Sequence, residues 1–352
     1  MTMSRRNFGG WLGLAGLMAA AGAPGKVLAQ LVAEPDLSFV HPELRRFAGQ
    51  MAKMTASMKL TPAFLKIARN GGGPQFGKPP ATDVPIEERR VPVPGGPDVL
   101  VYLVNARPGG ARPAILHTHG GGYVLGSARS DLHNVQKLAV ELDCVIATVE
   151  YRLAPETSYK GSIEDNYAGL KWLHSNAAAL GVDPKRIAVM GESAGGGHAA
   201  LLALTARDRK EVPVLAQILV YPMLDDRTAS SRQPGKNIGT ITWTGEANRF
   251  GWESFLGQKP GTAKVPAAAV PARRNDLAGL PPAFIGVGGI DLFVEEDVDY
   301  AHRLISAGVP CELLVAPGAF HGFDLFAADT SIAKRFTAAK IDALRRAFAG
   351  TF

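Results

Sequence analysis

The sequence predicts an α/β fold, with a mainly parallel central sheet, helices on both of its faces and a small helical cap. Three observations support this prediction. Strand-like apolar runs alternate with helix-like segments after about residue 113, which is the pattern of a parallel sheet. A Gly-Glu-Ser-Ala-Gly turn at residues 191–195 lies between one such strand and the next helix. The chain has 352 residues, of which 46% are hydrophobic, so we expect one large core with inserted elements instead of two independent domains.

The N-terminal part of the fold is predicted to hold two helices and a pair of strands. Apolar residues recur every three or four positions between residues 41 and 58, which indicates an amphipathic helix. Thr61 and Pro62 are typical of a helix start, and the glycines at 71–73 would end this second helix. Residues 86–93 and 99–104 predict two strands around a Pro-Gly-Gly-Pro turn.

The remaining strands and helices alternate. Expected strands cover residues 113–118, 144–149, 187–190, 216–221, 283–287 and 311–315, and expected helices cover residues 132–142, 163–176, 198–206 and 294–307. Residues 223–271 interrupt this alternation, and a connection of that length is usually a lid or an insertion. Within it, residues 246–256 predict a helix that Gly257 ends. We expect residues 30–85 and 223–271 to supply the cap, the alternative being a surface excursion that only packs on the fold.

The turn at residues 191–195 predicts that Ser193 is a nucleophile. A serine on a sharp turn between a strand and a helix is pushed out of the sheet, where a base and a substrate can reach it. The flanking glycines avoid collisions in such a turn. Farther along, Asp291 follows one expected strand and His321 follows the last. Because a neutral serine is a poor nucleophile, we expect His321 to take its proton and Asp291 to hold the imidazole in the right tautomer.

Other roles are open for two of these residues. His321 could be a structural histidine, and Asp291 could cap the helix expected at residues 294–307. Glu295 or Glu296 would then be the fallback for the acid. Further along the surface, we expect Arg273 and Arg274 to be solvated.

Upstream of the serine, residues 119–123 read His-Gly-Gly-Gly-Tyr. A glycine run of this kind exposes backbone N–H groups that can stabilise an oxyanion. His117 and His119 lie two positions apart, but no further Cys, Asp or His pair nearby completes a metal site, so we expect no metal. His119 is expected to hold the loop through hydrogen bonds, and His198 is expected to be structural.

As a group, these motifs resemble the hormone-sensitive-lipase family of bacterial esterases. The resemblance runs from about residue 91 to the C-terminus and includes the glycine run, Tyr-Arg-Leu-Ala-Pro-Glu at 151–156, Gly-Glu-Ser-Ala-Gly-Gly-Gly at 191–197, Tyr-Pro-Met at 221–223 and His-Gly-Phe at 321–323. Two departures are visible. Glu192 stands where many relatives have Asp, and the residues after Asp291 lack the Pro and Arg that many relatives carry.

The resemblance implies an α/β-hydrolase fold and a serine carboxylic ester hydrolase of the esterase type, acting on small esters with short- to medium-chain acyl groups. It implies a triad of Ser193, Asp291 and His321, whose chain order is that of α/β-hydrolases, and an oxyanion hole formed by the N–H groups of Gly121, Gly122 and Ala194. No cofactor is expected. We expect Tyr151, Arg152 and Glu156 to form a buried ion-pair support with no part in the chemistry.

Two other functions stay open at this point. An amidase or lactonase could use the same triad, because the triad does not choose the leaving group. A ligand-binding protein on this scaffold is the third possibility, since plant gibberellin receptors resemble the family but have lost the catalytic histidine. The presence of His321 argues against that interpretation. A closed, small acyl pocket is expected from the bulky Trp243, Trp252 and Phe255.

Charge and the first residues bear on partners and location. Residues 4–8 read Ser-Arg-Arg-Asn-Phe, a short apolar stretch comes next, and Val-Leu-Ala at 27–29 is a plausible cleavage site. We therefore expect residues 1–29 to be a twin-arginine export signal, residues 30–352 to be the mature domain, and the enzyme to be periplasmic or secreted. The alternative is an N-terminal cap helix. The stretch is too short for a stable membrane span.

Without residues 1–29 the formal net charge falls from +6 to +3, and no basic block is interleaved with aromatics, so nucleic-acid binding is not expected. A monomer or homodimer is expected.

Overall fold

The computed structural model describes residues 36–57, 59–72, 79–81 and 83–352. The predicted export signal at residues 1–29 and the predicted ends of the first two helices, at Met58 and Gly73, lie outside the described residues. The sheet and the helices around it belong to the unit Asp36–Phe352.

Eight strands form one sheet in the order β1-β2-β4-β3-β5-β6-β7-β8. The strands are β1 (Ile86–Val91), β2 (Val99–Val104), β3 (Arg112–Thr118), β4 (Val145–Glu150), β5 (Val182–Glu192), β6 (Gln217–Val220), β7 (Ala283–Gly288) and β8 (Cys311–Ala316). β2 pairs antiparallel with both β1 and β4. All pairings along the rest of the sheet, β4-β3-β5-β6-β7-β8, are parallel. The predicted opening hairpin and the predicted parallel sheet are both present.

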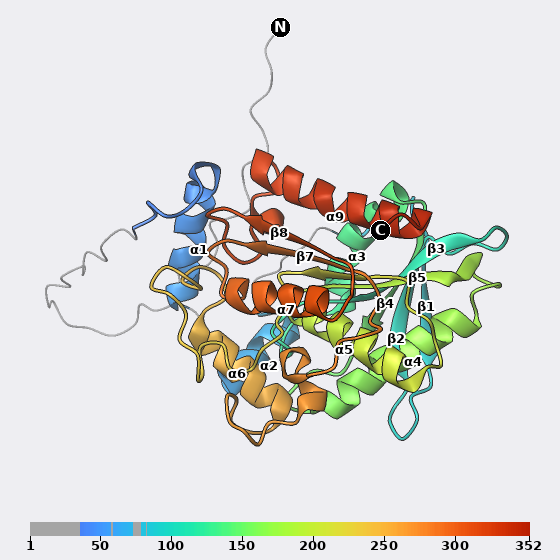
Figure 1. Cartoon of the computed structure of the whole chain (residues 1–352), viewed down its shortest axis with the longest axis horizontal. Coiled ribbons are helices and arrows are strands. Elements are labelled where there is room, and N and C mark those ends of the chain that lie inside the picture. The colour runs from blue at the N-terminus through green and yellow to red at the C-terminus, as the bar shows by residue number, and fades with distance from the viewer. Residues whose placement is uncertain (1–35, 58, 73–78, 82) are drawn as a thin grey trace, which may run out of the picture. The chain divides into compact units, whose positions relative to one another are not determined.

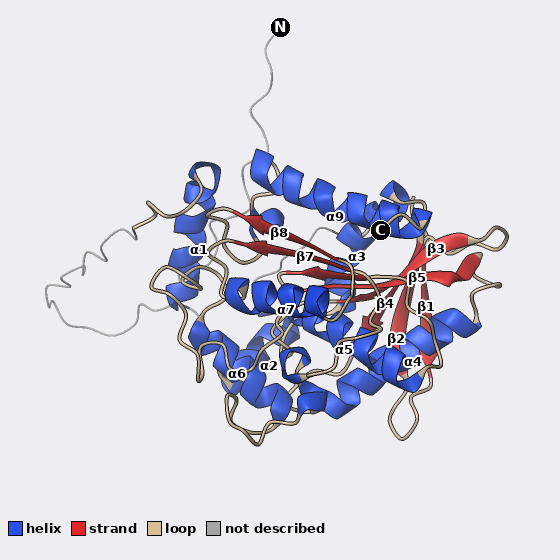
Figure 2. Cartoon of the chain, in the orientation of Figure 1, coloured by secondary structure: helices blue, strands red, loops and turns tan. Residues whose placement is uncertain are grey.

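Helices cover both faces of this sheet (Figures 1 and 2). On one face lie α3 (Ala128–Glu141) and α9 (Ser331–Ala349), whose apolar residues share a buried cluster with β2, β4 and β7. On the other face lie α4 (Tyr159–Ser175), α5 (Ala194–Arg209) and α7 (Val294–Ser306), packed on the opposite side of the same strands. Burial of apolar side chains on both faces explains why these strands read as continuous hydrophobic runs. α9 was not anticipated from the sequence.

Two segments outside the alternation lie beyond the end of the sheet that carries Ser193. The first comprises η1 (Pro42–Leu44), α1 (Arg45–Ser57), α2 (Pro62–Ile67) and η2 (Ala68–Gly72), and the second comprises α6 (Gly245–Leu256), η3 (Ala267–Ala269) and η4 (Pro271–Arg273). Leu65 of α2 shares a cluster with Trp252 and Phe255 of α6. α1 packs elsewhere, in the cluster around Phe320 and Phe323 that also borders the short helix α8 (Phe323–Phe326).

Some predicted boundaries moved because tertiary contacts extend the local pattern. β5 begins at Val182, five residues before the predicted strand, because Val182 pairs with Arg112 of β3 across a register irregularity. α5 begins directly after Ser193, before the apolar run that indicated it. Among the described residues, no helix has the length and apolar character that crossing a membrane requires.

Candidate active site

Ser193 occupies the sharp turn between β5 and α5. Its backbone has φ 58° and ψ −122°, a combination that is costly for a residue with a side chain and that persists only when its surroundings fix it. The N–H of Ser193 donates to the carbonyl of Val220 at 2.9 Å, and its carbonyl accepts from Gly197 at 3.0 Å. A Cβ on Gly195 would lie 2.0 Å from the carbonyl oxygen of Thr118, so only glycine fits where the first turn of α5 approaches β3.

His321 and Asp291 lie in line with this serine. His321 Nε2 is 2.9 Å from Ser193 Oγ, and His321 Nδ1 is 2.8 Å from Asp291 Oδ2. All three are buried, with Ser193 7% and His321 9% exposed and Asp291 fully enclosed. The loops after β5, β7 and β8 each supply one residue, so the parallel sheet brings together side chains that are up to 128 positions apart.

Asp291 contacts His321 and also holds the backbone just before α7, but it is not the helix N-cap, which is Phe293 without a side-chain cap. While Oδ2 faces His321, Oδ1 accepts the N–H of Phe293 at 3.0 Å, just before α7 begins. Glu295 is exposed. Glu296 is buried but faces the other way, accepting the N–H groups of Leu224 at 2.6 Å and Asp225 at 3.1 Å. The structure therefore brings Asp291 to the histidine, and neither Glu295 nor Glu296.

The imidazole of His321 lies between two aromatic rings that sequence reasoning did not single out for this purpose. Its centroid is 4.8 Å from that of Tyr221 and 5.2 Å from that of Phe293, both in edge arrangements. The hydroxyl of Tyr221 donates to Asp324 Oδ1 at 2.9 Å. Burial raises the pKa of Asp324. The only sequence signal for Asp324 was its place three residues after His321.

Gly121 and Gly122 follow Gly120, on which a Cβ would lie 3.5 Å from Ser193 Cβ, and Ala194 directly follows the serine. Among the described residues, none of the N–H groups of Gly121, Gly122 and Ala194 donates to a protein acceptor. Ala194 is the first residue of α5, where the helix dipole is positive and favours negative charge. Gly122 has φ 61°, and a Cβ there would lie 2.1 Å from Trp243 Cη2. The glycine thus admits both the loop conformation and the indole that lies against it.

His119 supports this loop. Its Nδ1 is 2.8 Å from the carbonyl oxygen of Gly120, and its ring stacks on Tyr151 with centroids 4.1 Å apart. Burial lowers the pKa of His119 to about 4, so it is neutral at pH 7 and donates from Nδ1. The hydroxyl of Tyr151 donates to the His119 carbonyl at 2.7 Å. Burial likewise lowers the pKa of His198 to about 3, as suits a structural histidine in an aromatic cluster.

A second polar pair lies directly behind the serine and was missed by the sequence reasoning. His117 Nε2 is 2.9 Å from Glu192 Oε2, and His117 Nδ1 is 2.8 Å from Thr148 Oγ1. Burial opposes charge on both residues, yet each partner prevails over it. Glu192 raises the pKa of His117, and His117 lowers the pKa of the Glu192 carboxyl. Each residue thus favours the charged form of the other, and His117 is engaged with Glu192. Among the described residues, no group of three metal-ligating side chains is close enough to hold an ion.

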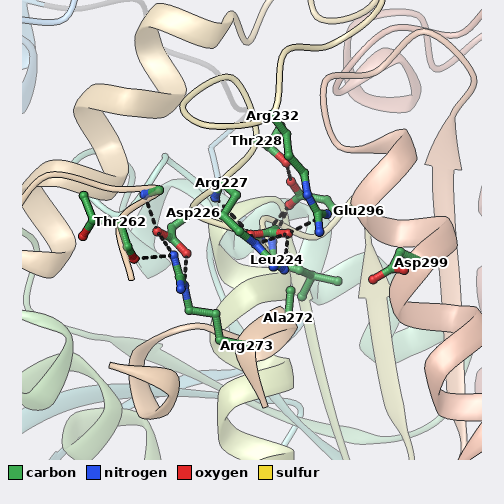
Figure 3. Close-up of polar contacts among 12 residues, drawn as sticks. Leu224, Asp226, Arg227, Thr228, Arg232, Thr262, Ala272, Arg273, Glu296 and Asp299 are labelled. Carbon is green, nitrogen blue, oxygen red and sulfur yellow. Dashed lines mark hydrogen bonds and ion pairs between the residues drawn. The ribbon is translucent and has the colours of Figure 1, made fainter. Parts of the chain in front are cut away.

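Buried ion pairs hold the segment that follows β6 (Figure 3). Arg273 Nε donates to Asp226 Oδ1 at 2.5 Å, and this carboxylate is fully enclosed. The prediction that Arg273 is solvated is wrong, because the chain folds back and places η4 beside Asp226. Asp225 is held by Arg227 at 2.7 Å and by Arg232 at 3.1 Å.

The ion pair expected around Tyr151 also has different members. Arg152 pairs with the buried Asp165 of α4 at 2.7 Å. Glu156 is 68% exposed and pairs with Arg69 at 2.8 Å. Sequence reasoning could not have found Asp165, because nothing distinguishes it from the other acidic residues of a surface helix.

Comparison with known proteins bears directly on this geometry. Residues 115–325 match a family described as having the alpha/beta hydrolase fold. The chain is 36% identical over 244 residues to the carboxylesterase NlhH of Mycobacterium tuberculosis, covering 67% of this chain and 74% of that protein. It is 36% identical over 220 residues to an ethyl acetate hydrolase of Pseudomonas putida, covering 60% and 66%.

The solved structures agree. A bacterial heroin esterase superimposes with a TM-score of 0.80 at 36% identity, covering 89% of this chain and 99% of that one. The expected α/β-hydrolase fold is confirmed by these matches and by the eight-stranded sheet. The chain therefore belongs to the hormone-sensitive-lipase-type branch of the alpha/beta-hydrolase family and is a serine carboxylic ester hydrolase.

Proposed function

We propose that Ser193, His321 and Asp291 hydrolyse small esters of short- to medium-chain carboxylic acids through an acyl-enzyme on Ser193. The observation that carries this proposal is the continuous hydrogen-bonded line from Ser193 Oγ through both ring nitrogens of His321 to Asp291, with distances of 2.9 and 2.8 Å. Nucleophile and base within this range, with the base oriented by a third group, is the arrangement that serine hydrolysis needs.

Each residue has one task in the reaction. Ser193 Oγ attacks the ester carbonyl carbon while His321 Nε2 takes its proton. The negative charge that develops on the carbonyl oxygen meets the N–H groups of Gly121, Gly122 and Ala194. The imidazolium then gives its proton to the departing alcohol, and the acyl group stays on Ser193. Water, deprotonated by the same imidazole, releases the carboxylic acid and restores the serine.

The small size of the substrate is supported by the burial of the site and by its relatives. Ser193 is 7% exposed, so a substrate must insert its carbonyl to reach it. One similar protein acts on ethyl acetate, as its name states. An amidase or lactonase activity would use the same residues, and turnover of anilides or lactones distinguishes it from esterase activity.

The test is Ser193→Ala on p-nitrophenyl esters and the matching anilides. We expect kcat to fall by several orders of magnitude, leaving only the rate that binding and the oxyanion donors supply. Wild-type enzyme should release a burst of p-nitrophenol equal to the enzyme concentration if deacylation is slower than acylation. Retention of a tenth of the wild-type turnover by the alanine variant would refute the nucleophile assignment, and faster turnover of anilides than of esters would refute the substrate class.

We also propose that residues 1–29 export the folded enzyme to the periplasm or beyond, on the strength of the paired Arg5 and Arg6 and the Val-Leu-Ala site. Changing both arginines to lysine should leave precursor inside the cell. Mass spectrometry of the exported protein should give an N-terminus near Gln30. Active protein with an intact Met1 or Thr2 in the native host contradicts this proposal.

Two further proposals concern assembly. The segments within 30–85 and 223–271 act as a cap over the site, which is supported by the shared cluster of Leu65, Trp252 and Phe255. The enzyme works as a monomer or homodimer. Light scattering on purified protein tests the second statement, and a larger assembly would contradict it.

A further inference from the structure

An unusual turn joins the catalytic histidine to the segment beyond β6. The N–H of Trp243 donates to the carbonyl of Ile241 at 3.0 Å, which closes a three-residue turn around Thr242 with φ 65°. Positive φ at a β-branched residue is a genuine outlier, and such γ-turns are rare and strained. A strained turn persists when its surroundings hold it. Here Thr242 Oγ1 donates to the carbonyl oxygen of His321 at 2.7 Å.

The turn places Trp243 against the oxyanion loop, which is the His-Gly-Gly-Gly-Tyr segment at residues 119–123. The indole tip lies so close to Gly122 that a Cβ on this glycine would be 2.1 Å from Cη2 and 2.6 Å from Cζ2 of Trp243. Gly251 of α6 approaches the same glycine, since a Cβ on Gly251 would be 2.6 Å from the Gly122 carbonyl oxygen. Both contacts place the excursion, residues 223–271, directly against Gly122, whose N–H is proposed to face the reacting carbonyl.

The orientation of the indole is fixed from behind. Trp243 Nε1 donates to Asn248 Oδ1 at 3.2 Å, and Asn248 Nδ2 donates to the carbonyl oxygen of Thr228 at 3.0 Å. Thr228 in turn bonds through its hydroxyl to Glu296, within the network drawn in Figure 3. A chain of hydrogen bonds therefore runs from α7, close to Asp291, to the ring that covers Gly122.

Trp243 also differs in exposure from the other tryptophan of the excursion. Trp252 is fully enclosed among Tyr123 and Phe255, so Trp252, expected with Trp243 and Phe255 to roof the acyl pocket, is itself covered by protein side chains. Trp243 is only half-buried. A large ring that is locked by a hydrogen bond, pressed against the oxyanion loop and still partly uncovered is suited to meet a substrate.

The chemistry fixes which part of the substrate meets it. The departing alcohol must face His321 Nε2 to receive its proton, and the carbonyl oxygen must face the N–H groups of Gly121, Gly122 and Ala194. The acyl chain therefore takes the remaining direction at the carbonyl carbon, away from His321. We propose that Trp243 is the specificity-determining residue that sets the maximum length of the acyl group, a proposal that rests on the proposed esterase function.

The experiment is a chain-length series of p-nitrophenyl esters, from acetyl to dodecanoyl, with wild type, Trp243→Phe, Trp243→Leu and Trp243→Ala. For wild type, kcat/KM should rise to about butyryl or hexanoyl and then fall. Each methylene that fits can add up to about fourfold in kcat/KM. A smaller side chain at residue 243 leaves room for more methylenes, so the maximum should move by two or more carbons. The ratio of kcat/KM for the octanoyl ester to that for the butyryl ester should then increase from Trp243→Phe to Trp243→Leu to Trp243→Ala. In Trp243→Ala it should be at least tenfold above wild type.

Two controls make the result specific. Trp172 of α4 is a half-buried tryptophan that packs on the apolar cluster between the sheet and α4, α5 and α7. Trp172→Leu should leave the octanoyl-to-butyryl ratio of kcat/KM within twofold of wild type. Butyrate esters of methanol, butanol and octanol should keep their wild-type ratios in the Trp243 variants. If Trp243→Ala fails to fold by circular dichroism, Trp243→Phe provides the same comparison.

The outcomes separate this proposal from the proposed function. If Ser193→Ala stays active, or wild type hydrolyses no ester, the proposed function fails. If Ser193 is required but the acyl preference of the Trp243 variants equals that of wild type, only the assignment of Trp243 is overturned. A change in the alcohol series without a change in the acyl series also overturns it, because Trp243 would then contact the leaving group.

Discussion

The end of the sheet that carries the triad and the excursion at residues 223–271 fix their side chains by different means. Around Ser193, backbone geometry does the work: positive φ at the serine, a glycine against Thr118 and N–H groups on rigid turns. The excursion relies on buried ion pairs and hydrogen bonds to distant residues, such as Arg273 with Asp226 and Glu296 with Leu224.

This difference explains how the two regions divide the reaction. A rigid backbone turn can place a nucleophile and its oxyanion donors to within the tolerance that catalysis needs. The excursion also contacts the triad, since the N–H of Met223 donates to the Ser193 carbonyl and Thr242 Oγ1 donates to the His321 carbonyl, and it supplies the residue proposed to set substrate preference. Trp243 is the half-buried residue by which the excursion meets Gly122 of the oxyanion loop.

The largest effect is expected at the base. His321→Ala removes the acceptor of the Ser193 proton, and triads that lose this residue lose about a millionfold in kcat. Stopped-flow or overnight assays with p-nitrophenyl butyrate measure it. The variant should unfold at a temperature close to that of wild type, and a residual kcat above one hundredth of the wild-type value would show that another group takes the proton.

A smaller loss is expected from Asp291→Asn, about ten-thousandfold in kcat, because the geometry survives while the histidine tautomer is wrong. Glu295→Gln is the matched control, since this neighbouring acid is exposed and should keep wild-type kcat. A silent Asp291→Asn together with a damaging Glu295→Gln would reverse the assignment of the acid.

In the excursion, Arg273→Ala should destabilise the fold by about 3–5 kcal/mol, because it leaves the enclosed Asp226 without its cation. Arg345→Ala is the control, since the Arg345–Glu141 pair is more than half exposed and should be worth at most about 1 kcal/mol. Urea unfolding measures both. Equal midpoints for the two variants would contradict the distinction between buried and exposed pairs.

The smallest effect concerns Asp297 of α7, which is fully enclosed although its two carboxylate oxygens have no hydrogen-bond partner among the residues that the structure describes. Burial, followed by the charges of Glu296 and Asp291, raises the pKa of Asp297 well above its ordinary value. Its contribution to stability is therefore fully present below the unfolded-state pKa of about 4 and is lost as the pH rises toward the folded-state value.

Asp297→Asn removes this titration, so the variant should gain stability relative to wild type as the pH rises from 4 to 8. Urea unfolding at the two pH values checks the sign. A variant that loses stability relative to wild type as the pH rises would mean that the carboxylate is ionised and partnered in the folded protein.

The sequence was sufficient to predict a mainly parallel sheet with an opening hairpin and most of the helices around it, although α9 was missed. It also singled out three residues that the structure joins by hydrogen bonds. Short-range signals carry these features: apolar runs give the strands, and glycines around Ser193 mark a turn that few other residues could form. Asp291 and His321 could be named because each follows a strand of a parallel sheet, and the ends of such strands meet at one edge.

The rest depends on contacts between distant residues. The partner of Arg152 is Asp165 and that of Arg273 is Asp226, and several other acids were equally plausible from sequence alone. The Glu192–His117 pair results from the adjacency of β3 and β5 in the sheet, in which His117 lies opposite Met190. Trp243 could be recognised as bulky, but only the structure shows that it lies half-buried against Gly122, whereas Trp252 is enclosed against Tyr123 of the same loop.

The central claim is that Ser193, activated by His321, is the nucleophile. Covalent labelling with a fluorophosphonate, followed by peptide mass spectrometry, tests it most directly, because the reagent bonds to an activated serine and the peptide identifies which one. We predict one label per chain on the peptide that contains Ser193. Ser193→Ala should take up no label, and His321→Ala should take up none within the time that wild type needs for complete labelling. A label on another serine, or undiminished ester hydrolysis by protein that takes up no label, would contradict it.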